Sequence, residues 1–499
     1  MIRAFFENPS NHQTSQPRLL LISYHFPPAQ TAGALRWEKL SQHAAERGWA
    51  MDVVALDPSS MPILDMSRMA ALPPGIRVYG VPEPVLWVER LERNVWRAYR
   101  RIRPIKEAAD RNFCGGCAPV GGRGTARSAP RHSSFGRAEI RWTLQDLSGG
   151  LRRGYHAWLD YARQGEWARA AVDICRLLSG SRSYTAVITC GPPHMVHVAG
   201  RRVARATGTP LVMDLRDPWS LVERLPEVIA SPVWLALAAR YERQTIARAA
   251  LVVTNTEPAR LALEAKYPDA RSRIVTVTNG YDEDPQLRSR HGSRFTIAYA
   301  GAIYLDRNPR MLFRAAARVV REFALSPSDF RIELMGEVDS VDGVPTLVIA
   351  SEEGIDGFVG LRPPGPRREA SQFLAEGSML LSLPQDSDMA IPSKIFEYMQ
   401  YDAWILALAD RGSATEHLLR DSHADVVAPQ DLESLTAVLR KRYLQYAHGE
   451  RPTRLATELR YSRREQARRL FDAIEACLPL AGVSGHRRGV LRPTSPVTH

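Results

Sequence analysis

Residues 186–219 read AVITCGPPHMVHVAGRRVARATGTPLVMDLRDPW. An apolar run at 186–190 is followed by a Gly-Pro-Pro turn, by apolar residues at helical spacing up to position 206, and by a second apolar run at 211–215. Gly208 and Pro210 end the helix, because glycine adopts the left-handed conformation that closes helices and proline cannot continue one. The stretch therefore predicts a strand, a helix and a second, parallel strand.

The same alternation continues on both sides of this unit. Before it we expect a strand at 18–23, a helix at 34–47 and a strand at 52–56. Beyond residue 290, strands are expected at 295–300, 331–335, 357–359, 379–383, 404–408 and 425–427, with helices between them. This pattern is typical of α/β proteins with parallel sheets. Because 499 residues exceed what one core usually holds, we expect two doubly wound domains at 18–285 and 290–450, a helix at 461–478 and a disordered tail at 481–499.

Composition limits the classes of partner. Lys and Arg total 66 against 54 Asp and Glu, a net charge of +12, which favours anionic partners such as phosphorylated small molecules, nucleic acid or anionic lipid. The five Cys are an odd number and widely spread, unlike the framework of a secreted disulfide protein. The first 18 residues lack the apolar core of a signal peptide, and no apolar run is long enough to span a bilayer. We therefore expect a cytoplasmic protein whose membrane contact, if any, is peripheral.

Much of the excess charge lies in one segment. Residues 89–141 hold thirteen Arg or Lys against five Asp or Glu, and we interpret residues of about 85–150 as a basic insertion in the first domain. Its first part has Trp87, Trp96 and Tyr99 among basic residues, at a spacing that suits an amphipathic helix. Two interpretations stay open: a solvated insertion, or a segment that rests on an anionic membrane surface at the inner face of the membrane. We expect no nucleic-acid partner.

A phosphate site is predicted where Ser393 opens a helix. Ser393 is a good N-cap, which places Lys394 in the first helical turn, where a cation is unfavourable unless an anion sits in front of it. Glu397 lies on the same face, one residue too late for a capping box with Ser393. The alternative is an ordinary surface pair between Lys394 and Glu397.

A second anion site is predicted at the end of the strand at 295–300. Gly301 forms the turn, Arg307 lies in the loop, and Asn308 with Pro309 begins the next helix as N-cap and first residue. Open α/β sheets bind ligands at the carboxyl ends of their strands, and helix N-termini favour phosphate. An exposed Arg in an ordinary turn is the alternative.

In the first domain, His194 and the pair Arg216 and Asp217 follow two neighbouring strands. The apolar stripe of the helix at 194–206 predicts that His194 faces the loop side and not the core. These three residues would then share one crevice as the catalytic group. The alternative is a capping His and an Arg to Asp pair that fixes the loop.

Two metal motifs are weak. Asp386 and Asp388 match the Asp-x-Asp pattern that can hold a cation, but such pairs are frequent. Cys114 and Cys117 lack a second pair of zinc ligands at the usual spacing. We therefore expect no metal in the site.

Taken together, the motifs resemble those of the family-4 type of retaining glycosyltransferases. The segments that carry the resemblance are LLLISYHFPPAQTAGALRWEKLSQHAAERGW (19–49), VITCGPPHMVHVAGRRVARATGTPLVMDLRDPW (187–219), LVVTNTEPARLAL (251–263), TVTNGYD (276–282), IAYAGAIYLDRNPRML (297–312) and PSKIFEYMQYDAWILAL (392–408). The resemblance implies the GT-B architecture, with two Rossmann-like domains facing a central cleft and a helix at 455–480 that packs back on the first domain. It further implies a hexosyltransferase that moves a sugar from a nucleotide-sugar donor, UDP- or GDP-linked, to a glycan or lipid-linked acceptor in polysaccharide biosynthesis, with no cofactor.

The resemblance also assigns roles to single residues. Arg307 would touch the diphosphate where the family usually has Lys, Glu397 would hold the ribose, and Lys394 belongs to a subset with the pattern P-S-K-x-F-E-Y. The other site residues that the resemblance implies fall into two groups. On the donor side they are Gly301, Gly336, Gly360 and Ser393, and on the acceptor side they are Gly33 and Arg36. The sequence departs from the family at Met389, where the first Glu of a pair would fall, and at Ala302, where Arg is frequent.

The charge pattern suits this reaction, because cleavage of the sugar to phosphate bond leaves negative charge that Arg307, Lys394 and helix N-termini can stabilise. Two alternatives stay open. The departures at Met389 and Ala302 allow an inactive scaffold in polysaccharide assembly, which would not bind nucleotides. A sugar-nucleotide epimerase has a similar double Rossmann shape and acts without an acceptor.

Overall fold

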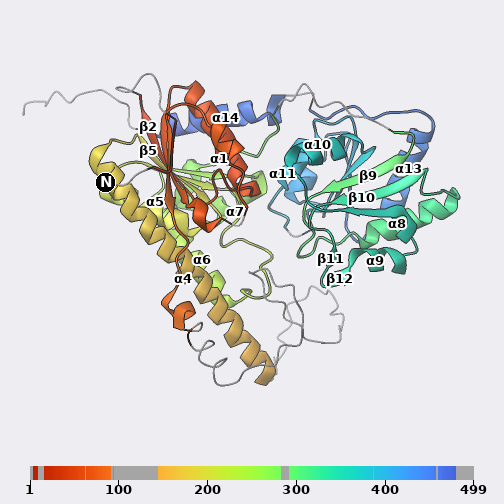
Figure 1. The fold of residues 1–499 in the computed structure, drawn as a ribbon, viewed down its shortest axis with the longest axis horizontal. Coiled ribbons are helices and arrows are strands. Elements are labelled where there is room, and N and C mark those ends of the chain that lie inside the picture. Colours follow the sequence, from red (N-terminus) through yellow and green to blue (C-terminus); the bar gives the residue numbers. More distant parts are fainter. Residues whose placement is uncertain are drawn as a thin grey trace, which may run out of the picture.

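The computed structural model describes residues 4–8, 16–61, 63–91, 94, 144–282, 292–385, 387–456 and 459–478. Two parallel sheets lie side by side, each covered by helices on both faces (Figure 1). Among these described residues, no helix is long and apolar enough to cross a membrane.

The first sheet has eight strands in the order β1-β4-β3-β2-β5-β6-β7-β8. All neighbours pair in parallel except β1, which runs antiparallel to β4 at one edge. The strands span Phe6–Asn8 (β1), Arg18–Ser23 (β2), Ala50–Leu56 (β3), Ile76–Val81 (β4), Ala186–Gly191 (β5), Leu211–Leu215 (β6), Leu251–Thr254 (β7) and Ile274–Thr276 (β8). Because the seven parallel strands point the same way, their carboxyl ends form one edge of the sheet.

The stretch at 186–219 forms the predicted unit of strand, helix and parallel strand. Helix α5 (Met195–Thr207) joins β5 to β6, and Gly208 closes it with φ of 72°. Val187 pairs with Leu211 and Gly191 with Leu215. The expected strand at 52–56 begins two residues earlier, and the expected helix at 34–47 is α1 (Ala32–Glu46).

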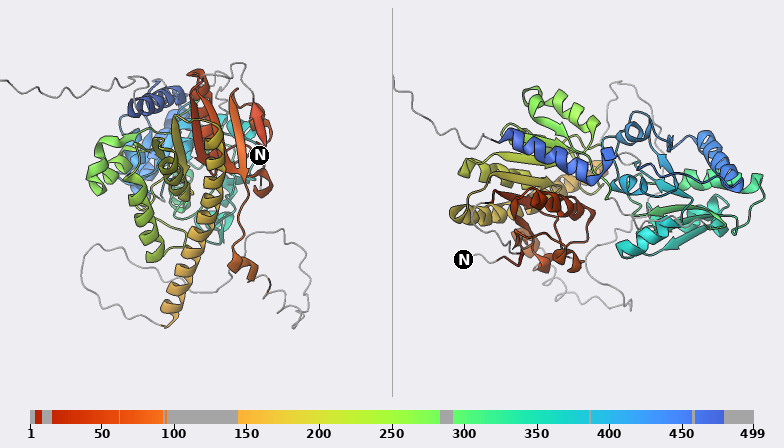
Figure 2. Two further views of the ribbon diagram at one scale, coloured as in Figure 1. Left: turned by 90° about the vertical axis from the view of Figure 1, so that its left-hand side faces the viewer. Right: turned by 90° about the horizontal axis from the view of Figure 1, so that it is seen from above.

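Helices α4 (Leu144–Ser181), α5 and α6 (Pro232–Ile246) pack on one face of this sheet, and α1 and α14 (Arg463–Cys477) pack on the other. The last of these is the C-terminal helix, so the chain returns to its first domain after completing the second, as the view from above shows (Figure 2). Leu470, Phe471 and Ile474 of α14 are fully buried among the side chains of α1 and the sheet. Helix α7 (Glu257–Lys266) follows β7.

The second sheet has six parallel strands in the order β13-β10-β9-β14-β15-β16. They span Phe295–Ala300 (β9), Phe330–Met335 (β10), Val359–Arg362 (β13), Met379–Ser382 (β14), Trp404–Leu408 (β15) and Asp425–Val427 (β16). Helices α8 (Arg310–Glu322), α9 (Thr346–Glu352) and α13 (Leu432–Ala447) cover one face, and α10 (Arg367–Ala375), α11 (Ser393–Tyr398) and α12 (Ala414–Leu419) cover the other. The hairpin β11 (Ser340–Val341) and β12 (Val344–Pro345) lies outside the sheet.

The strand expected at 357–359 is wrong in its bounds. Asp356–Phe358 form a 3-10 turn. The strand begins at Val359, which is the first of these residues to pair with β10, opposite Ile332. Apolar residues alone do not separate a buried turn from a buried strand.

The basic insertion is described only at its two ends. Residues 87–91 are helical, as the spacing around Trp87 predicts, whereas Trp96, Tyr99, Cys114 and Cys117 lie outside the described residues. Residues 144–150, expected as part of the insertion, begin α4 instead. Residues 283–291, between the two domains, and residues 479–499, which include the expected tail, are also outside the described part of the chain.

Candidate functional site

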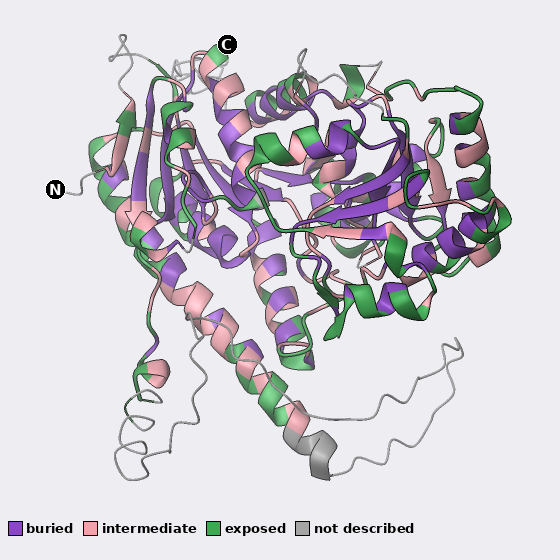
Figure 3. Cartoon of the chain, turned by 45° about the vertical axis from the view of Figure 1, so that its right-hand side comes forward, coloured by how far each residue is buried: buried purple, intermediate pink, exposed green. Residues whose placement is uncertain are grey.

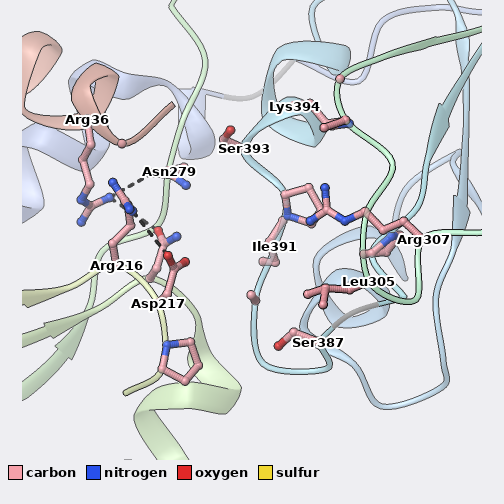
Figure 4. Close-up of a pocket in the computed structure, with 18 of the residues that line it drawn as sticks. Arg36, Arg216, Asp217, Asn279, Leu305, Arg307, Ser387, Ile391, Ser393 and Lys394 are labelled. Carbon is pink, nitrogen blue, oxygen red and sulfur yellow. Dashed lines mark hydrogen bonds and ion pairs between the residues drawn. The ribbon is translucent and has the colours of Figure 1, made fainter. Parts of the chain in front are cut away.

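A pocket of about 500 Å³ lies between the two domains. Its N-terminal wall comes from the first turns of α1 and α14 and from the segments after β6, β7 and β8. Its C-terminal wall comes from the loops after β9 and β14 and the start of α11. The carboxyl edges of both sheets therefore face the same space, which is where open α/β sheets bind ligands. In Figure 4, Arg36, Arg216, Asp217 and Asn279 face Arg307, Ser393 and Lys394 across this space.

The charged residues of the lining are almost all basic. The described lining has one carboxylate, Asp217, and six cationic side chains: Arg36, Arg216, Arg224, Arg307, Lys394 and Arg463. Such a surplus of cations around a concave site attracts anionic ligands and stabilises negative charge that forms there.

On the C-terminal wall, Lys394 lies against the end of β9. Its Nζ is 3.9 Å from the centroid of the Tyr299 ring, a cation–π contact. Gly301 leaves room for it, since a Cβ on Gly301 would lie 2.4 Å from Nζ. The backbone at Gly301 has φ of 146°, which L side chains rarely adopt, so the strand end and the ammonium fit only with glycine here.

Gly336, at the end of the neighbouring strand β10, supports the same turn. A Cβ at this position would lie 2.1 Å from the Gly301 carbonyl oxygen. Gly336 does not line the pocket, so it supports Gly301 from behind without facing the ligand.

Arg307 reaches the pocket from the loop between β9 and α8. Its guanidinium carbon is 4.2 Å from the centroid of the Tyr304 ring, which also lines the pocket. Helix α8 begins one residue later than expected, at Arg310, so its N-cap is Pro309 and not Asn308. Asn308 still satisfies the first helical N–H, because Asn308 Oδ1 accepts a hydrogen bond of 2.9 Å from Arg310 N.

Ser393 is not the N-cap of α11, as the sequence pattern indicated. It is the first helical residue, Pro392 is the N-cap, and no side chain caps the helix. Proline at the cap leaves the first backbone N–H groups without a side-chain acceptor. Ser393 and Lys394 therefore both line the pocket at a helix start.

On the N-terminal wall, Gly33 brings the start of α1 against Arg216. A Cβ on Gly33 would lie 2.4 Å from Arg216 Nη1 and 3.1 Å from the ring of His25. Arg216 Nε is 3.6 Å from Asp217 Oδ2, so the pair is loose, and both side chains line the pocket. Burial and, next, the charge of Arg216 lower the pKa of His25 to about 4, so that its imidazole is neutral at pH 7.

Arg36 lines the pocket, but its guanidinium is held by the domain itself. It forms a two-point ion pair with Asp214, with Nε to Oδ2 at 2.9 Å and Nη2 to Oδ1 at 3.0 Å. Its other N–H groups donate hydrogen bonds to Val277 O, Thr278 O and Asn279 Oδ1. Burial opposes the charge of Arg36, but Asp214 outweighs it and raises the pKa of Arg36. Arg36 thus ties α1 to β6 and to the segment that follows β8.

His194 does not share the crevice with Arg216 and Asp217, and that prediction is wrong. The residue is 7% exposed, its ring stacks on Trp219 with centroids 5.1 Å apart, and it does not line the pocket. Burial, then His197 and Arg216, lower its pKa far below the ordinary value, so the imidazole is neutral. The loop after β6 folds Trp219 over it, an arrangement that the periodicity of α5 cannot reveal.

Two further residues of the expected donor site are placed outside the pocket lining. Gly360 lies inside edge strand β13, where a Cβ would be 2.4 Å from Glu333 Oε2. Glu397 is paired with Arg367, with Nη2 to Oε1 at 3.0 Å. To reach a ligand in the pocket, the Glu397 carboxylate has to leave Arg367.

Two arginines and two asparagines of the lining were not among the predicted site residues. Asn255 and Asn279 lie in the motifs LVVTNTEP and TVTNGYD, so their position after two strands was a usable signal. Arg463 begins α14 and contacts Asp282 at 2.9 Å, and burial lowers its pKa. Arg224 reaches across the cleft to Asp306 of the second domain at 3.3 Å. The residues around Arg224 and Arg463 in the sequence do not predict a binding site, because only tertiary folding brings these two arginines to the pocket.

The loop before α11 contacts the first domain through its backbone. Thr256 Oγ1 donates to Met389 O at 2.6 Å, and Asp388 N donates to Glu223 Oε2 at 2.5 Å. Burial, then Glu223 and Asp410, raise the pKa of Asp388. Asp386 lies outside the described residues. Met389, where the sequence departs from the family pattern, therefore joins the two domains through its carbonyl group.

Solved structures with the same arrangement of domains exist. A sucrose-phosphate synthase from Thermosynechococcus elongatus matches 92% of this chain and 97% of its own with a TM-score of 0.56 and 13% identity. The chain has the GT-B fold. Two further GT-B structures match 92% of the chain: the lipopolysaccharide outer core galactosyltransferase WaaB (TM-score 0.52, 12% identity, all of that chain) and WaaG, a glycosyltransferase involved in lipopolysaccharide biosynthesis (TM-score 0.50, 14% identity, 98% of that chain). No protein-family model and no curated protein sequence matches this GT-B protein.

Proposed function

We propose that the protein is a glycosyltransferase that moves a sugar from a nucleotide-sugar donor to an acceptor, in the cleft between its two GT-B domains. The observation that carries this proposal is the interdomain pocket of about 500 Å³, with six cationic side chains at the facing carboxyl edges of the two sheets. A nucleoside diphosphate has the negative charge that this lining favours.

The donor diphosphate would lie against the C-terminal wall. Lys394 and Arg307 are both held there by aromatic rings, so their charges are positioned before a ligand arrives. When the sugar to phosphate bond breaks, the diphosphate gains negative charge. Cations already in place stabilise that charge without reorganising, which lowers the barrier.

The acceptor would enter along the N-terminal wall, where Arg216 packs against Gly33 and lies with Asp217 opposite the donor side. We propose transfer with retention and without a metal, a UDP- or GDP-linked donor, and an acceptor that is a lipid-linked or polysaccharide precursor. The protein would work as a peripheral protein at the cytoplasmic face of a membrane. The names of WaaB and WaaG, which place both in lipopolysaccharide synthesis, support this class of acceptor.

A calorimetric titration of the full chain with UDP, GDP and TDP sugars tests the proposal. We expect saturable binding of one nucleotide class. Absence of binding by every nucleotide sugar would contradict the proposal and favour a scaffold. Conversion of a nucleotide sugar in the absence of acceptor would instead indicate an epimerase. The configuration of the anomeric carbon in the product, read by NMR, tests retention.

A further inference from the structure

Large exposed hydrophobic side chains gather at one edge of the first domain. Of the nineteen in the described part of the chain, twelve lie in the segments that follow β3, β4 and β6, in the N-terminal half of α4 or in the first turn of α6. All of these segments lie at the carboxyl edge of the sheet, because helices that lead into or out of parallel strands have their N-termini there. The twelve are Ile63, Leu64, Met66, Val85, Trp87, Leu91, Leu151, Tyr155, Trp158, Val228, Val233 and Leu235.

Helix α4 carries part of this surface away from the domain. Its 38 residues span about 57 Å at 1.5 Å per residue, whereas a six-residue strand of the sheet spans roughly 20 Å. The first buried side chain in its described part is Ala157. The N-terminal end of α4 therefore projects beyond the packed core, as Figures 1 and 3 both show.

The projecting part of α4 has an apolar stripe. Leu151, Tyr155 and Trp158 are spaced i, i+4 and i+7, so they lie on one helix face. Their side chains are 77%, 39% and 45% exposed, and the rings of Tyr155 and Trp158 stack with centroids 6.2 Å apart. On the helical residues 87–91, Trp87 and Leu91 share a face in the same way and are 70% and 54% exposed. We name these five side chains the apolar ridge.

Specific contacts fix the elements that bear the ridge. Glu89, two residues after Trp87, pairs with Arg163 of α4. Trp234 of α6 donates from Nε1 to Asp160 Oδ2 at 3.3 Å, which holds α6 against the same part of α4. The exposed side chains are thus displayed on braced helices.

The charge beside the ridge is basic. Arg90, Arg152 and Arg153 are exposed next to its members. Trp and Tyr with adjacent Arg suit the boundary between lipid headgroups and acyl chains. A projecting helix also suits a deformable bilayer better than a rigid protein partner, which needs a matching groove.

We propose that the apolar ridge docks on an anionic lipid bilayer, with Leu151, Trp158, Trp87 and Leu91 inserted and the three arginines at the headgroups. This proposal deepens the proposed function, because the ridge and the interdomain pocket both lie at the carboxyl edge of the first sheet. A lipid-linked acceptor would then meet the enzyme on the side from which the pocket is reached.

The test is sedimentation of the full chain with vesicles of phosphatidylcholine alone or with added phosphatidylglycerol. The ridge variant is the double substitution Leu151→Glu and Trp158→Glu. The matched control is Leu177→Glu, at the other end of α4, where Leu177 is 64% exposed. We expect the ridge variant to lose binding to the anionic vesicles by about tenfold or more, because two apolar side chains no longer enter the bilayer. The control should bind as the unaltered protein does.

The charge contribution is tested separately with Arg152→Gln and Arg153→Gln together. This variant should bind anionic vesicles several-fold more weakly, and high salt should release the unaltered protein. Equal binding by the ridge variant and the unaltered protein, or binding that is indifferent to phosphatidylglycerol, would overturn the proposal. So would loss of a dimer in the ridge variant, measured by sedimentation velocity, with vesicle binding unchanged, since the ridge would then contact a second copy.

Nucleotide titration of the same variants separates this inference from the proposed function. Ridge-dependent vesicle binding without any nucleotide binding would support the docking surface and contradict glycosyl transfer. Nucleotide binding together with vesicle binding that does not depend on the ridge would support glycosyl transfer and contradict the docking surface. Circular dichroism of each variant verifies that it is folded.

Discussion

The Lys394 ammonium nitrogen lies 3.9 Å from the centroid of the Tyr299 ring, so the first turn of α11 is joined to the end of β9. This contact places a cation in the pocket at a helix start, where it opposes the helix dipole. A cation in that position is favourable when an anion faces it, which makes Lys394 the sharpest test of the donor site.

Substitution of Lys394 by Ala should weaken nucleoside diphosphate binding by about 1.5–3 kcal/mol, the range for a hydrogen bond to a charged group. Calorimetry measures the change. Lys441→Ala is the control, since Lys441 is exposed on α13, away from the pocket. Unchanged affinity in a folded Lys394→Ala protein would remove Lys394 from the donor site.

Substitution of Gly336 by Ala should destabilise the second domain by more than about 2 kcal/mol, because φ of 126° is strained for alanine and the new Cβ meets the Gly301 carbonyl. Gly343→Ala is a matched control with φ of 79° and open space around the new Cβ, so only the backbone strain remains. Urea unfolding of both variants gives the difference. Equal losses would show that the close contact with Gly301 carries no energy.

Substitution of Arg36 by Ala should cost about 3–5 kcal/mol of folding stability, because it leaves the buried Asp214 carboxylate without its partner. Arg440→Ala, which breaks an exposed pair with Glu322, should change stability little. Thermal or urea unfolding compares the two. If Arg36→Ala kept full stability and lost acceptor binding alone, Arg36 would be a ligand contact and not an anchor.

The free energy of unfolding should fall as the pH is lowered from about 7 towards 4. Burial lowers the pKa of His197 to about 3, and burial with Arg216 lowers that of His25 to about 4. In the unfolded chain these imidazoles bind protons below about pH 6.5. Unfolding therefore takes up protons in this range, and each histidine contributes a slope of up to about 1.4 kcal/mol per pH unit.

Urea unfolding at a series of pH values measures this slope. His194→Phe retains a ring against Trp219 but removes one buried imidazole, so it should flatten the dependence. A slope that does not respond to His194→Phe would assign the pH dependence to other groups.

Transfer activity should survive EDTA, because Lys394, Arg307 and the other arginines of the pocket already supply positive charge to the leaving diphosphate. Activity is measured before and after chelation with the same donor and acceptor. Loss that Mn²⁺ restores would instead make Asp386 and Asp388 candidates for metal ligands.

Local sequence patterns predict the two parallel sheets and most of their strands. Strands β2, β6, β9, β15 and β16 have the predicted bounds, because buried parallel strands are short apolar runs between turn residues, and that signal is local. The same logic applies to polar residues that follow strands, and Arg216, Asp217 and Arg307 line one pocket. Lys394, predicted from a helix start, lines it as well.

Which further residues line the pocket depends on long-range packing. Arg224 and Arg463 reach it through contacts with Asp306 and Asp282, distant in sequence or on another element. His194 leaves it, because the loop after β6 lays Trp219 over the imidazole. Periodicity predicts which face of a helix is buried, but not what covers the residue at its N-cap. That cover depends on loops whose path is fixed by long-range packing and not by local propensity.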